Sequence, residues 1–283
     1  MATLEEKKFM ANNLKQVVII TGANSMIGKA LVLKFANENW KIHATVRSKS
    51  NKDLIQGQNI VYHEMDLENQ KSIHKTVDAI LKSESKIDAL INNAGFVLSG
   101  PFECSSDEQI RRQMEVNFFG TVFMIKALLP KLKTQKNSSI INMSSLCGLV
   151  TFPMLSMYHA SKWALEGFSE SLMFELESFE IRVKLIEPGG VKENDYASNV
   201  EFASIEKPEY KALLDKVHKT NWFPSFSEPN YIAQEVYNAA LDKTSKLRYK
   251  IGSDCMLFLD ERNNGFKDES YLKSIKKRIS GEI

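Results

Sequence analysis

Short apolar runs rich in β-branched residues alternate with amphipathic stretches from residue 15 to about residue 190. Such runs, separated by helical patterns, are typical of a parallel sheet that helices cover on both faces. The strand candidates are VVII (17–20), IHATV (42–46), IVYHEM (60–65), IDALIN (87–92), SIINMS (139–144) and IRVKLIE (181–187), and the helical patterns lie near 26–38, 68–83, 107–134 and 156–178. Because crossovers between parallel strands are right-handed, we predict an α/β fold with one doubly wound sheet of about seven strands.

The chain contains no internal repeat and no Pro/Gly-rich linker, so we predict that its 283 residues form a single domain. The pattern loosens in 191–230, which has mixed polarity and three prolines, and an insertion of this length is usually functional. We expect it to be a substrate lid, followed by a helix from about Tyr231 and by a C-terminal helical tail over 256–283. The aromatic residues of this segment are Tyr196, Phe202, Tyr210, Trp222, Phe223 and Phe226. They could line an apolar pocket for a lipid-like or aromatic carbonyl compound. They could equally well pack the lid onto its own domain.

The overall charge and the cysteines limit the partners that we expect. A net charge of +2 is too near zero to predict nucleic acid or an anionic membrane as the main partner. No apolar run approaches the roughly 18 residues that cross a bilayer, and the start of the chain carries acids and lacks the apolar segment of a secretory signal. Cys104, Cys147 and Cys255 lack metal-ligand spacing, so we predict no metal site and a reducing, cytoplasmic location.

The stretch TGANSMIG (21–28) follows the first strand candidate and opens the first helical pattern, which is where a dinucleotide's phosphates bind. Backbone N–H groups point outward at a helix start, and the helix dipole favours negative charge there. Gly22 would form the tight turn and Gly28 would let helix and strand pack closely. Met26 replaces the middle glycine, which normally lets the backbone approach the pyrophosphate. Alone, the motif fits a cofactor turn and a purely structural turn about equally.

The second strand candidate ends in HATVRSKS, which contains no acid. A site selective for NAD places an acid there, roughly 20 residues after the turn, on the ribose 2′-hydroxyl. A guanidinium such as that of Arg47 can instead bind a 2′-phosphate through two parallel hydrogen bonds, whereas a carboxylate would repel it. The residues therefore favour NADP(H), although an exposed basic loop would have the same sequence.

Tyr158 and Lys162 in YHASK lie four positions apart, so on a helix they share one face. A neighbouring ammonium favours the phenolate, and lowering a tyrosine pKa from about 10 to about 7 takes roughly 4 kcal/mol. Such a tyrosine could exchange a proton with a substrate oxygen near neutral pH. The pair alone is weak evidence, because most such pairs are surface contacts on a helix.

Two further strand candidates end in polar motifs that would share one edge of the sheet. These motifs are NMSS (142–145) and NNAG (92–95), and VNFFG (116–120) places Asn117 in the helix between them. Ligands bind at the carboxyl edge of open α/β sheets. The motifs therefore predict one site at this edge.

In this order and spacing, the motifs resemble the classical short-chain dehydrogenase/reductase family over roughly residues 15–255. The matching elements are TGxxxxxG, NNAG, Asn117, Ser145, YxxxK and the PG of EPGG (187–190). The resemblance implies a Rossmann-type fold and an NADP(H)-dependent oxidoreductase. Such an enzyme interconverts a ketone or aldehyde and an alcohol by hydride transfer.

The resemblance also implies a role for each matching polar residue. Tyr158 would be the acid/base, and Ser145 would hydrogen-bond the reacting oxygen. Lys162 would lower the tyrosine pKa and hold the nicotinamide ribose, while Asn117 would anchor a proton relay. The family spacing of thirteen residues before the tyrosine selects Ser145 over Ser144.

Other positions match residues that contact the cofactor in the family. Ser25 and Arg47 match the binding site of the 2′-phosphate, and Asp66 matches the residue beside the adenine ring. Asn92 and Gly95 match the segment that lines the adenosine side. The predicted cofactor-binding set is Gly22, Asn24, Ser25, Met26, Ile27, Gly28, Arg47, Ser48, Asp66, Leu67, Asn93, Ala94, Gly95, Tyr158, Lys162, Pro188, Gly189 and Val191.

Two positions depart from the family pattern, and both concern the cofactor. Met26 stands for the middle glycine, and Glu193 replaces a threonine that usually contacts the cofactor. A carboxylate facing a pyrophosphate would be costly unless it turned to solvent. We expect a working but modified site that binds NADPH more weakly, by about 1–2 kcal/mol.

The departures leave two other functions open. A non-catalytic or weakly active NADP(H)-binding protein would keep the fold while its site decayed, but decay has no reason to spare all four catalytic positions. An epimerase on the same scaffold could use the same serine and tyrosine. Family members associate through the long helices near 107–134 and 156–178, so the resemblance implies a homodimer or homotetramer.

Overall fold

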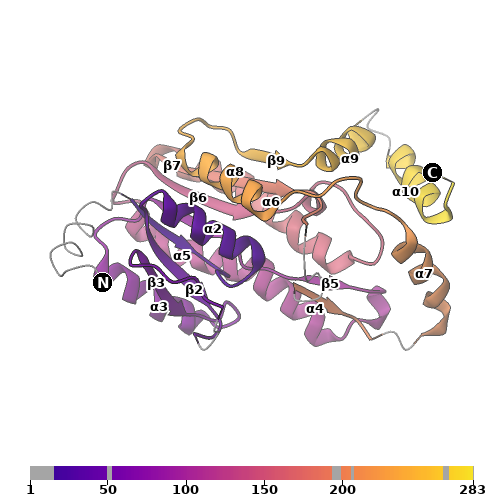
Figure 1. Ribbon diagram of the computed structural model, residues 1–283, viewed down its shortest axis with the longest axis horizontal. Helices are drawn as coiled ribbons and strands as arrows, with labels where there is room; N and C mark the ends of the chain where they lie inside the picture. Colours follow the sequence, from indigo (N-terminus) through magenta and orange to yellow (C-terminus); the bar gives the residue numbers. More distant parts are fainter. Residues whose placement is uncertain (1–15, 50–52, 193–198, 205–206, 264–267, 283) are drawn as a thin grey trace.

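The computed structural model describes residues 16–49, 53–192, 199–204, 207–263 and 268–282. Its centre is a seven-stranded parallel sheet in the order β3-β2-β1-β4-β6-β7-β9 (Figure 1). The strands are β1 (Val17–Ile20), β2 (Lys41–Val46), β3 (Ile60–Glu64), β4 (Ala89–Asn92), β6 (Ser138–Met143), β7 (Ile181–Pro188) and β9 (Arg248–Ile251). β1 pairs with β2 on one side and with β4 on the other. The winding of the chain therefore changes direction between β1 and β4. The predicted single-domain, doubly wound fold is confirmed.

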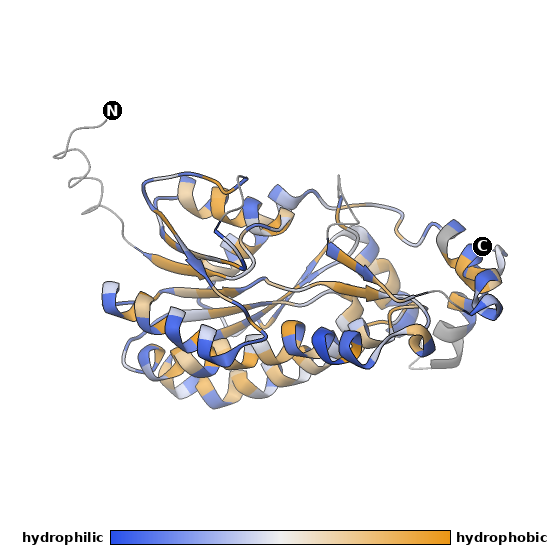
Figure 2. Ribbon diagram, turned by 90° about the horizontal axis from the view of Figure 1, so that it is seen from below, coloured by the Kyte–Doolittle hydropathy of each residue, from blue (hydrophilic) through white to orange (hydrophobic). Residues whose placement is uncertain are grey.

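Helices cover both faces of this sheet. On one face α2 (Met26–Asn37) packs against α8 (Pro229–Leu241), over a core that contains Phe35, Trp40 and Val236. On the other face lie α3 (Gln70–Ser83), α5 (Gly120–Leu132) and α6 (Ser156–Leu176). Figure 2 shows the sheet between these two layers, with its strands largely apolar. The central strands β4 and β6 are buried at every position, as expected for strands covered on both sides.

Side chains at the helix starts explain where several helices begin. The side chain of Ser25 accepts a hydrogen bond from Gly28 N at the start of α2, and that of Asn69 accepts from Lys71 N and Ser72 N at the start of α3. α8 begins at Pro229, whose fixed φ suits the first helical position.

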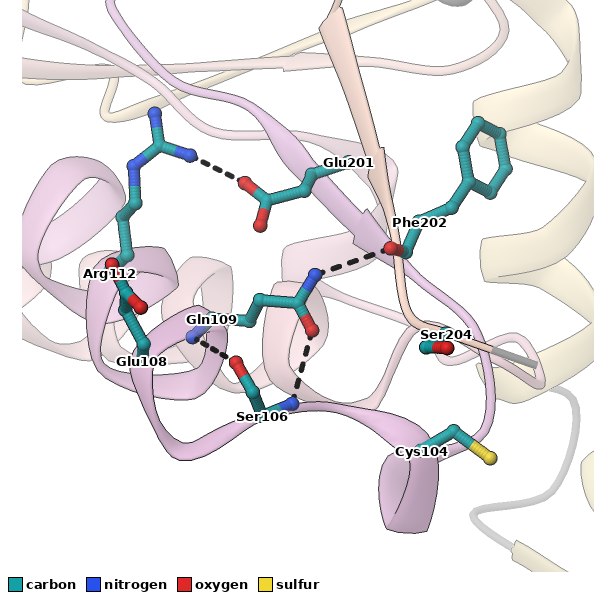
Figure 3. A pocket seen from close by; sticks show the side chains of 8 residues that line it. All are labelled: Cys104, Ser106, Glu108, Gln109, Arg112, Glu201, Phe202 and Ser204. Carbon is teal, nitrogen blue, oxygen red and sulfur yellow. Dashed lines mark hydrogen bonds and ion pairs between the residues drawn. The ribbon is translucent and has the colours of Figure 1, made fainter. Parts of the chain in front are cut away.

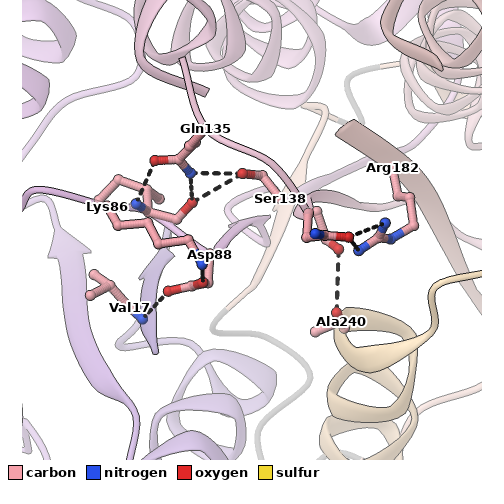
Figure 4. Close-up of polar contacts among 10 residues, drawn as sticks. Val17, Lys86, Asp88, Gln135, Ser138, Arg182 and Ala240 are labelled. Carbon is pink, nitrogen blue, oxygen red and sulfur yellow. Dashed lines mark hydrogen bonds and ion pairs between the residues drawn. The ribbon is translucent and has the colours of Figure 1, made fainter. Parts of the chain in front are cut away.

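Polar contacts fix the amino ends of the central strands (Figure 4). Asp88 Oδ2 accepts from Val17 N at 2.9 Å, which ties the start of β4 to the start of β1. Ser138, at the start of β6, donates to Ile87 O at 3.3 Å and accepts from Gln135 Nε2 at 2.7 Å. These contacts set the register of β1, β4 and β6 at the edge opposite to the strand ends that carry the sequence motifs.

Three strands and one helix interruption were not predicted. β9 alternates buried Tyr249 and Ile251 with two basic residues, so it shows no apolar run. β5 (Val97–Ser99) and β8 (Val200–Phe202) pair in parallel as a separate two-stranded sheet, and three residues are too few to show periodicity. The predicted helix over 107–134 is divided into α4 (Asp107–Met114), a π-helical turn at Glu115–Phe119, and α5.

The aromatic residues of the predicted lid do not share one environment. Trp222 and Phe223 pack against Phe152 in a buried cluster that includes residues of α9 (Ser253–Asn263). Phe202 and Phe226 are 52% and 55% exposed. Part of the aromatic set therefore packs this segment onto its own domain.

The remaining lid aromatics and the C-terminal helices complete this side of the molecule. Tyr210 donates a hydrogen bond to Glu103, and Tyr196 lies outside the described residues. α7 (Lys211–Lys219), α9 and α10 (Asp268–Ser280) lie together at one end of the molecule (Figure 1). Within the part of the chain that the structure describes, none of the helices has the length and apolar composition of a membrane span.

Candidate active site

The turns after β1 and β4 touch at the carboxyl edge of the sheet. Thr21 Oγ1 accepts hydrogen bonds from the backbone N–H groups of Asn93 and Ala94, both at 3.0 Å. Gly22 has a φ of 64°, and a Cβ there would lie 2.8 Å from the Cα of Ala94. This close approach requires glycine. The structure therefore brings TGANSMIG and NNAG together at one edge, as the sequence predicts.

A cavity of about 780 Å³ opens at this edge, within the size range of small-molecule and cofactor sites. Its walls come from the turn after β1, the ends of β2 and β3, the segment after β4, and β8. The predicted cofactor residues that line it are Gly22, Asn24, Ser25, Met26, Ile27, Arg47, Asp66, Leu67, Asn93, Ala94 and Gly95. Those that lie outside its lining are Gly28, Ser48, Tyr158, Lys162, Pro188, Gly189 and Val191.

The first turn of α2 forms one wall of the cavity. The backbone N–H groups of Met26 and Ile27 have no acceptor among the residues that the structure describes, so they can bind a phosphate together with the helix dipole. Ser25 Oγ accepts from Gly28 N at 3.1 Å and donates to Gly22 O at 3.0 Å. A 2′-phosphate on Ser25 would therefore have to compete with this capping interaction.

Charged side chains on the cavity wall bear on the choice of cofactor. Arg47 lines the cavity as predicted, and so do Lys29 and Asp53. Lys29 lies three positions after Met26 on α2, and this spacing could have identified it. Asp53 lies seven positions after the end of β2, and no sequence signal marks it.

Further lining residues are ones to which the sequence gave no individual role in binding. Several of these residues follow β3 or belong to α4 and β8. The order of the elements along the chain does not show that these elements lie beside the turn after β1. They are Thr45, Val46, Met65, Glu68, Phe96, Arg112, Val116, Asn199, Val200 and Glu201.

Tyr158 and Lys162 lie in the first two turns of α6, and their side chains approach each other. Lys162 Nζ lies 5.7 Å from the centre of the Tyr158 ring and donates to Met143 O at 2.7 Å. Burial lowers the pKa of Lys162 to about 8, and the nearby carboxylate of Glu166 opposes this shift. At neutral pH the amine is therefore mostly protonated, and it places a positive charge beside the phenol.

Ser145 lies directly after β6 and caps the short helix Leu146–Gly148. Its Oγ accepts from Cys147 N at 3.1 Å and lies 3.5 Å from Pro188 O, to which it can donate. Ser144 is buried, and its Oγ has no hydrogen-bond partner in the described part of the chain. Because Lys162 bonds to Met143, the lysine is anchored to the same strand end that carries Ser145.

Asn117 lies in the π-helical turn and is buried. Its Oδ1 accepts from Phe96 N at 3.0 Å, and its Nδ2 donates to Phe96 O at 2.9 Å and to Ser161 Oγ at 3.2 Å. Both side-chain donors are thus engaged. The side chain joins the segment after β4 to α6, so a proton relay at Asn117 would use its remaining acceptor capacity or its backbone.

The segment after β7 is held from the C-terminal side of the fold. Gly189 N donates to Ile251 O at 2.9 Å, and Gly190 N donates to Asp254 Oδ2 at 2.5 Å. A Cβ at Gly189 would lie 2.1 Å from Asp254 Oδ2, so the segment requires glycine there. Val191 forms a bridge with Ser227, and Glu193 lies outside the described residues.

Two buried carboxyl groups, those of Glu166 and Glu187, lie together, and Glu166 is near the predicted catalytic residue Lys162. Glu187, at the end of β7, is fully buried, and burial and the neighbouring Glu166 raise its pKa to about 8. Arg248 Nε lies 3.0 Å from Glu166 Oε2 and 3.3 Å from Glu187 Oε1. One guanidinium therefore faces both carboxyl groups, and the raised pKa favours the neutral form of Glu187.

Residues 199–201, at the start of β8 (Val200–Phe202), form another wall of the cavity. Arg112 Nη1 lies 2.5 Å from Glu201 Oε2 (Figure 3). Arg112 Nε lies 3.1 Å from Glu68 Oε1. Gln109 Nε2 donates to Phe202 O at 3.2 Å, so α4 holds both the side chain and the backbone of β8. A second cavity, of about 570 Å³, lies along this contact between α4 and β8 (Figure 3).

The sequence model of the short chain dehydrogenase family matches residues 16–202. The chain belongs to the short-chain dehydrogenase family. An uncharacterized oxidoreductase of Schizosaccharomyces pombe is 32% identical over 237 residues, which cover 82% of this chain and 98% of that protein. A 3-ketodihydrosphingosine reductase of Bacteroides thetaiotaomicron is 36% identical over 174 residues, or 62% of this chain and 63% of that one.

A solved structure supports the same assignment. The crystal structure of a short-chain dehydrogenase from Streptomyces avermitilis has a TM-score of 0.80 and 26% identity to this short-chain dehydrogenase, and the match covers 94% of this chain and 98% of that one. The predicted family is therefore confirmed. The family consists of oxidoreductases that use nicotinamide cofactors, and the cavity beside the first turn of α2 suits such a group.

Proposed function

We propose that this short-chain dehydrogenase is an NADP(H)-dependent oxidoreductase that interconverts a ketone or aldehyde and an alcohol. The observation that carries the proposal is the convergence at one edge of the sheet. There, Lys162 contacts the ring of Tyr158 and the strand end that carries Ser145, and the turn at Gly22 borders a cavity of cofactor size.

The residues around the cavity would hold the cofactor in a defined orientation. The free N–H groups of Met26 and Ile27 would bind the pyrophosphate, and Asp66 and Leu67 would border the adenine ring. When bound, NADP(H) supplies or accepts the hydride. Tyr158, Lys162 and the segment Pro188–Val191 would lie at the nicotinamide end, beyond the described cavity.

The remaining chemistry belongs to side chains of this chain. In the reductive direction Tyr158 would donate a proton to the substrate oxygen, and the ammonium of Lys162 would stabilise the phenolate that remains. Ser145 would hydrogen-bond the same oxygen and stabilise the negative charge that develops on it. Cys147 N donates to Ser145 Oγ, and the serine proton would turn from Pro188 O, which lies 3.5 Å from Oγ, toward the substrate oxygen.

The choice of NADP(H) rests on the charges at the far end of the cavity. Arg47 and Lys29 place two positive charges on its wall, which favours a 2′-phosphate. Asp53 lies on the same wall and would weaken this preference if it faced the phosphate. The described structure gives no acid at the end of β2, where an NAD-selective site would have one.

The substrate class, the assembly and the location are each proposed from a separate feature of the chain. An apolar carbonyl compound is proposed because Tyr158 packs against the apolar cluster around Phe152, and because the Bacteroides relative is named a 3-ketodihydrosphingosine reductase. A homodimer or homotetramer through the helices around α5 and α6 would cover Phe119, Trp163 and Phe174, which are 38%, 42% and 67% exposed. We place the protein in the cytoplasm because its three cysteines are free, as is usual in a reducing compartment.

NADPH consumption over a broad panel of ketones and aldehydes tests the proposal. Turnover that the Tyr158→Phe variant loses would support it. Binding of NADPH without turnover of any compound, in either direction, would instead support the non-catalytic NADP(H)-binding protein.

A further inference from the structure

His159 follows Tyr158 on α6, but its side chain serves a different part of the site. Neighbouring residues on a helix point about 100° apart, so when Tyr158 faces Lys162 the next side chain faces the loop 145–152. His159 is 5% exposed and lies between this loop and the helix. Its ring lies 6.0 Å from the ring of Phe152, centre to centre.

Both ring nitrogens of His159 are bonded to the backbone of this loop. Phe152 N donates to Nε2 at 2.8 Å, and Nδ1 lies 2.8 Å from Cys147 O. Because Nε2 accepts a proton donor, the neutral ring carries its own proton on Nδ1, which donates to Cys147 O. Both hydrogen bonds therefore require one tautomer of the neutral ring.

Cys147 links His159 to the catalytic serine. The carbonyl of Cys147 accepts from His159 Nδ1, and its N–H donates to Ser145 Oγ at 3.1 Å. The peptide groups of this residue are thus fixed at one end by the helix that carries Tyr158 and at the other end by the serine hydroxyl. A rotation of the loop at Cys147 would change the direction of the Ser145 hydroxyl.

We propose that His159 is a positioning residue. Through the backbone of Cys147, it keeps the hydroxyl of Ser145 in a fixed orientation relative to the phenol of Tyr158. This inference rests on the proposed function. His159 touches neither of these catalytic side chains with its ring nitrogens, so it acts through the loop. Residues 147, 152 and 159 do not line the cavity beside Gly22, so the effect should fall on turnover and spare cofactor binding.

Two variants separate the two hydrogen bonds of the ring. In His159→Asn the side-chain amide can reach Cys147 O, because Asn Nδ2 lies near the position of His Nδ1. In His159→Gln the amide oxygen lies near the position of His Nε2 and can accept from Phe152 N. We expect His159→Gln to lower kcat about tenfold, a fraction of the hundredfold or more that the loss of one oxyanion donor costs. His159→Asn should stay within about threefold of the parent protein.

The control is the affinity for NADPH, measured by fluorescence titration, which should change less than twofold in both variants. Hydrogen exchange gives a readout that is independent of activity: the amides of residues 147–150 should exchange faster in His159→Gln than in His159→Asn. The Phe152 N–H is left out of this comparison, because it loses its own acceptor in His159→Asn. Equal rates of exchange and equal losses of kcat in the two variants would overturn the proposal.

A double-mutant comparison tests whether His159 acts through Ser145. If it does, His159→Gln should cause little further loss of kcat in a Ser145→Ala background, whereas an independent effect would again lower kcat about tenfold and overturn the proposal. The proposed function fails separately, since in that case the parent protein would turn over no carbonyl compound with NADPH. The exchange difference at residues 147–150 would still report whether His159 holds the loop.

Discussion

Replacing Arg112 by methionine should loosen β8 while keeping the apolar stem of the side chain. Arg112 joins Glu201 of β8 to Glu68 on the cavity wall, and its guanidinium lies 4.9 Å from the centre of the Phe96 ring. The three charged side chains are 28–35% exposed, so each ion pair contributes at most about 1 kcal/mol. The contact with Phe96 adds about 0.5–1 kcal/mol. After screening by solvent, we expect the substitution to remove about 1–2 kcal/mol of the free energy that holds β8 at the cavity wall. NADPH should then dissociate about five- to thirtyfold faster.

Stopped-flow displacement of NADPH measures this rate. Arg111→Met is the matched control, because Arg111 precedes Arg112 on α4 and is exposed. Glu201→Gln separates the effect of β8 from a direct contact between Arg112 and the cofactor, since it breaks the ion pair and keeps the arginine. Faster dissociation in both Arg112→Met and Glu201→Gln is expected. An unchanged rate in Glu201→Gln would show that this ion pair does not hold β8 over the cavity.

Three other substitutions test the cofactor site and the buried carboxyl pair. Met26→Gly should tighten NADPH binding about five- to thirtyfold, because Met26 occupies the start of α2 on the cavity wall; equal or weaker binding in a titration would refute the steric explanation. Arg47→Ala should weaken NADPH binding by at least about tenfold and NADH binding less than twofold, and equal losses would argue against a 2′-phosphate contact. Glu187 has a raised pKa of about 8 against an ordinary value of 4.5, so its contribution to stability should fall as the pH rises through this range. Glu187→Gln should therefore raise Tm by a few degrees at pH 8 and by much less at pH 5, whereas a pH-independent difference would contradict the raised pKa.

The sequence predicted the fold because the long, buried strands carry their own signal. β6 (SSIINM) and β7 (IRVKLIEP) each contain a group of apolar, largely β-branched residues, and the crossover rule gives the hand of the connections between parallel strands. β9 was missed because it packs only Tyr249 and Ile251 inward and exposes Lys250. β5 and β8 were missed because pairing between residues near 98 and 201 depends on the folded chain and leaves no local pattern.

The candidate site was predictable where a residue follows a strand. Motif order brought Gly22, Asn93 and Ser145 to the edge where the strands end. The role of Arg112 and Glu201 was not predictable, because an ion pair that spans 89 positions has no sequence signature. The hydrogen bonds of His159 were missed for a related reason: they connect it to backbone groups, which any residue in the loop would offer.

Transfer of deuterium from NADPH labelled at the reactive carbon of its nicotinamide tests the central claim most directly. With a ketone that the panel identifies, we expect the label on the carbon that carries the new hydroxyl group. Tyr158→Phe should bind the labelled cofactor with unchanged affinity and transfer the label at least about a hundredfold more slowly. Equal transfer rates in the two proteins, or release of the label to solvent, would contradict the account.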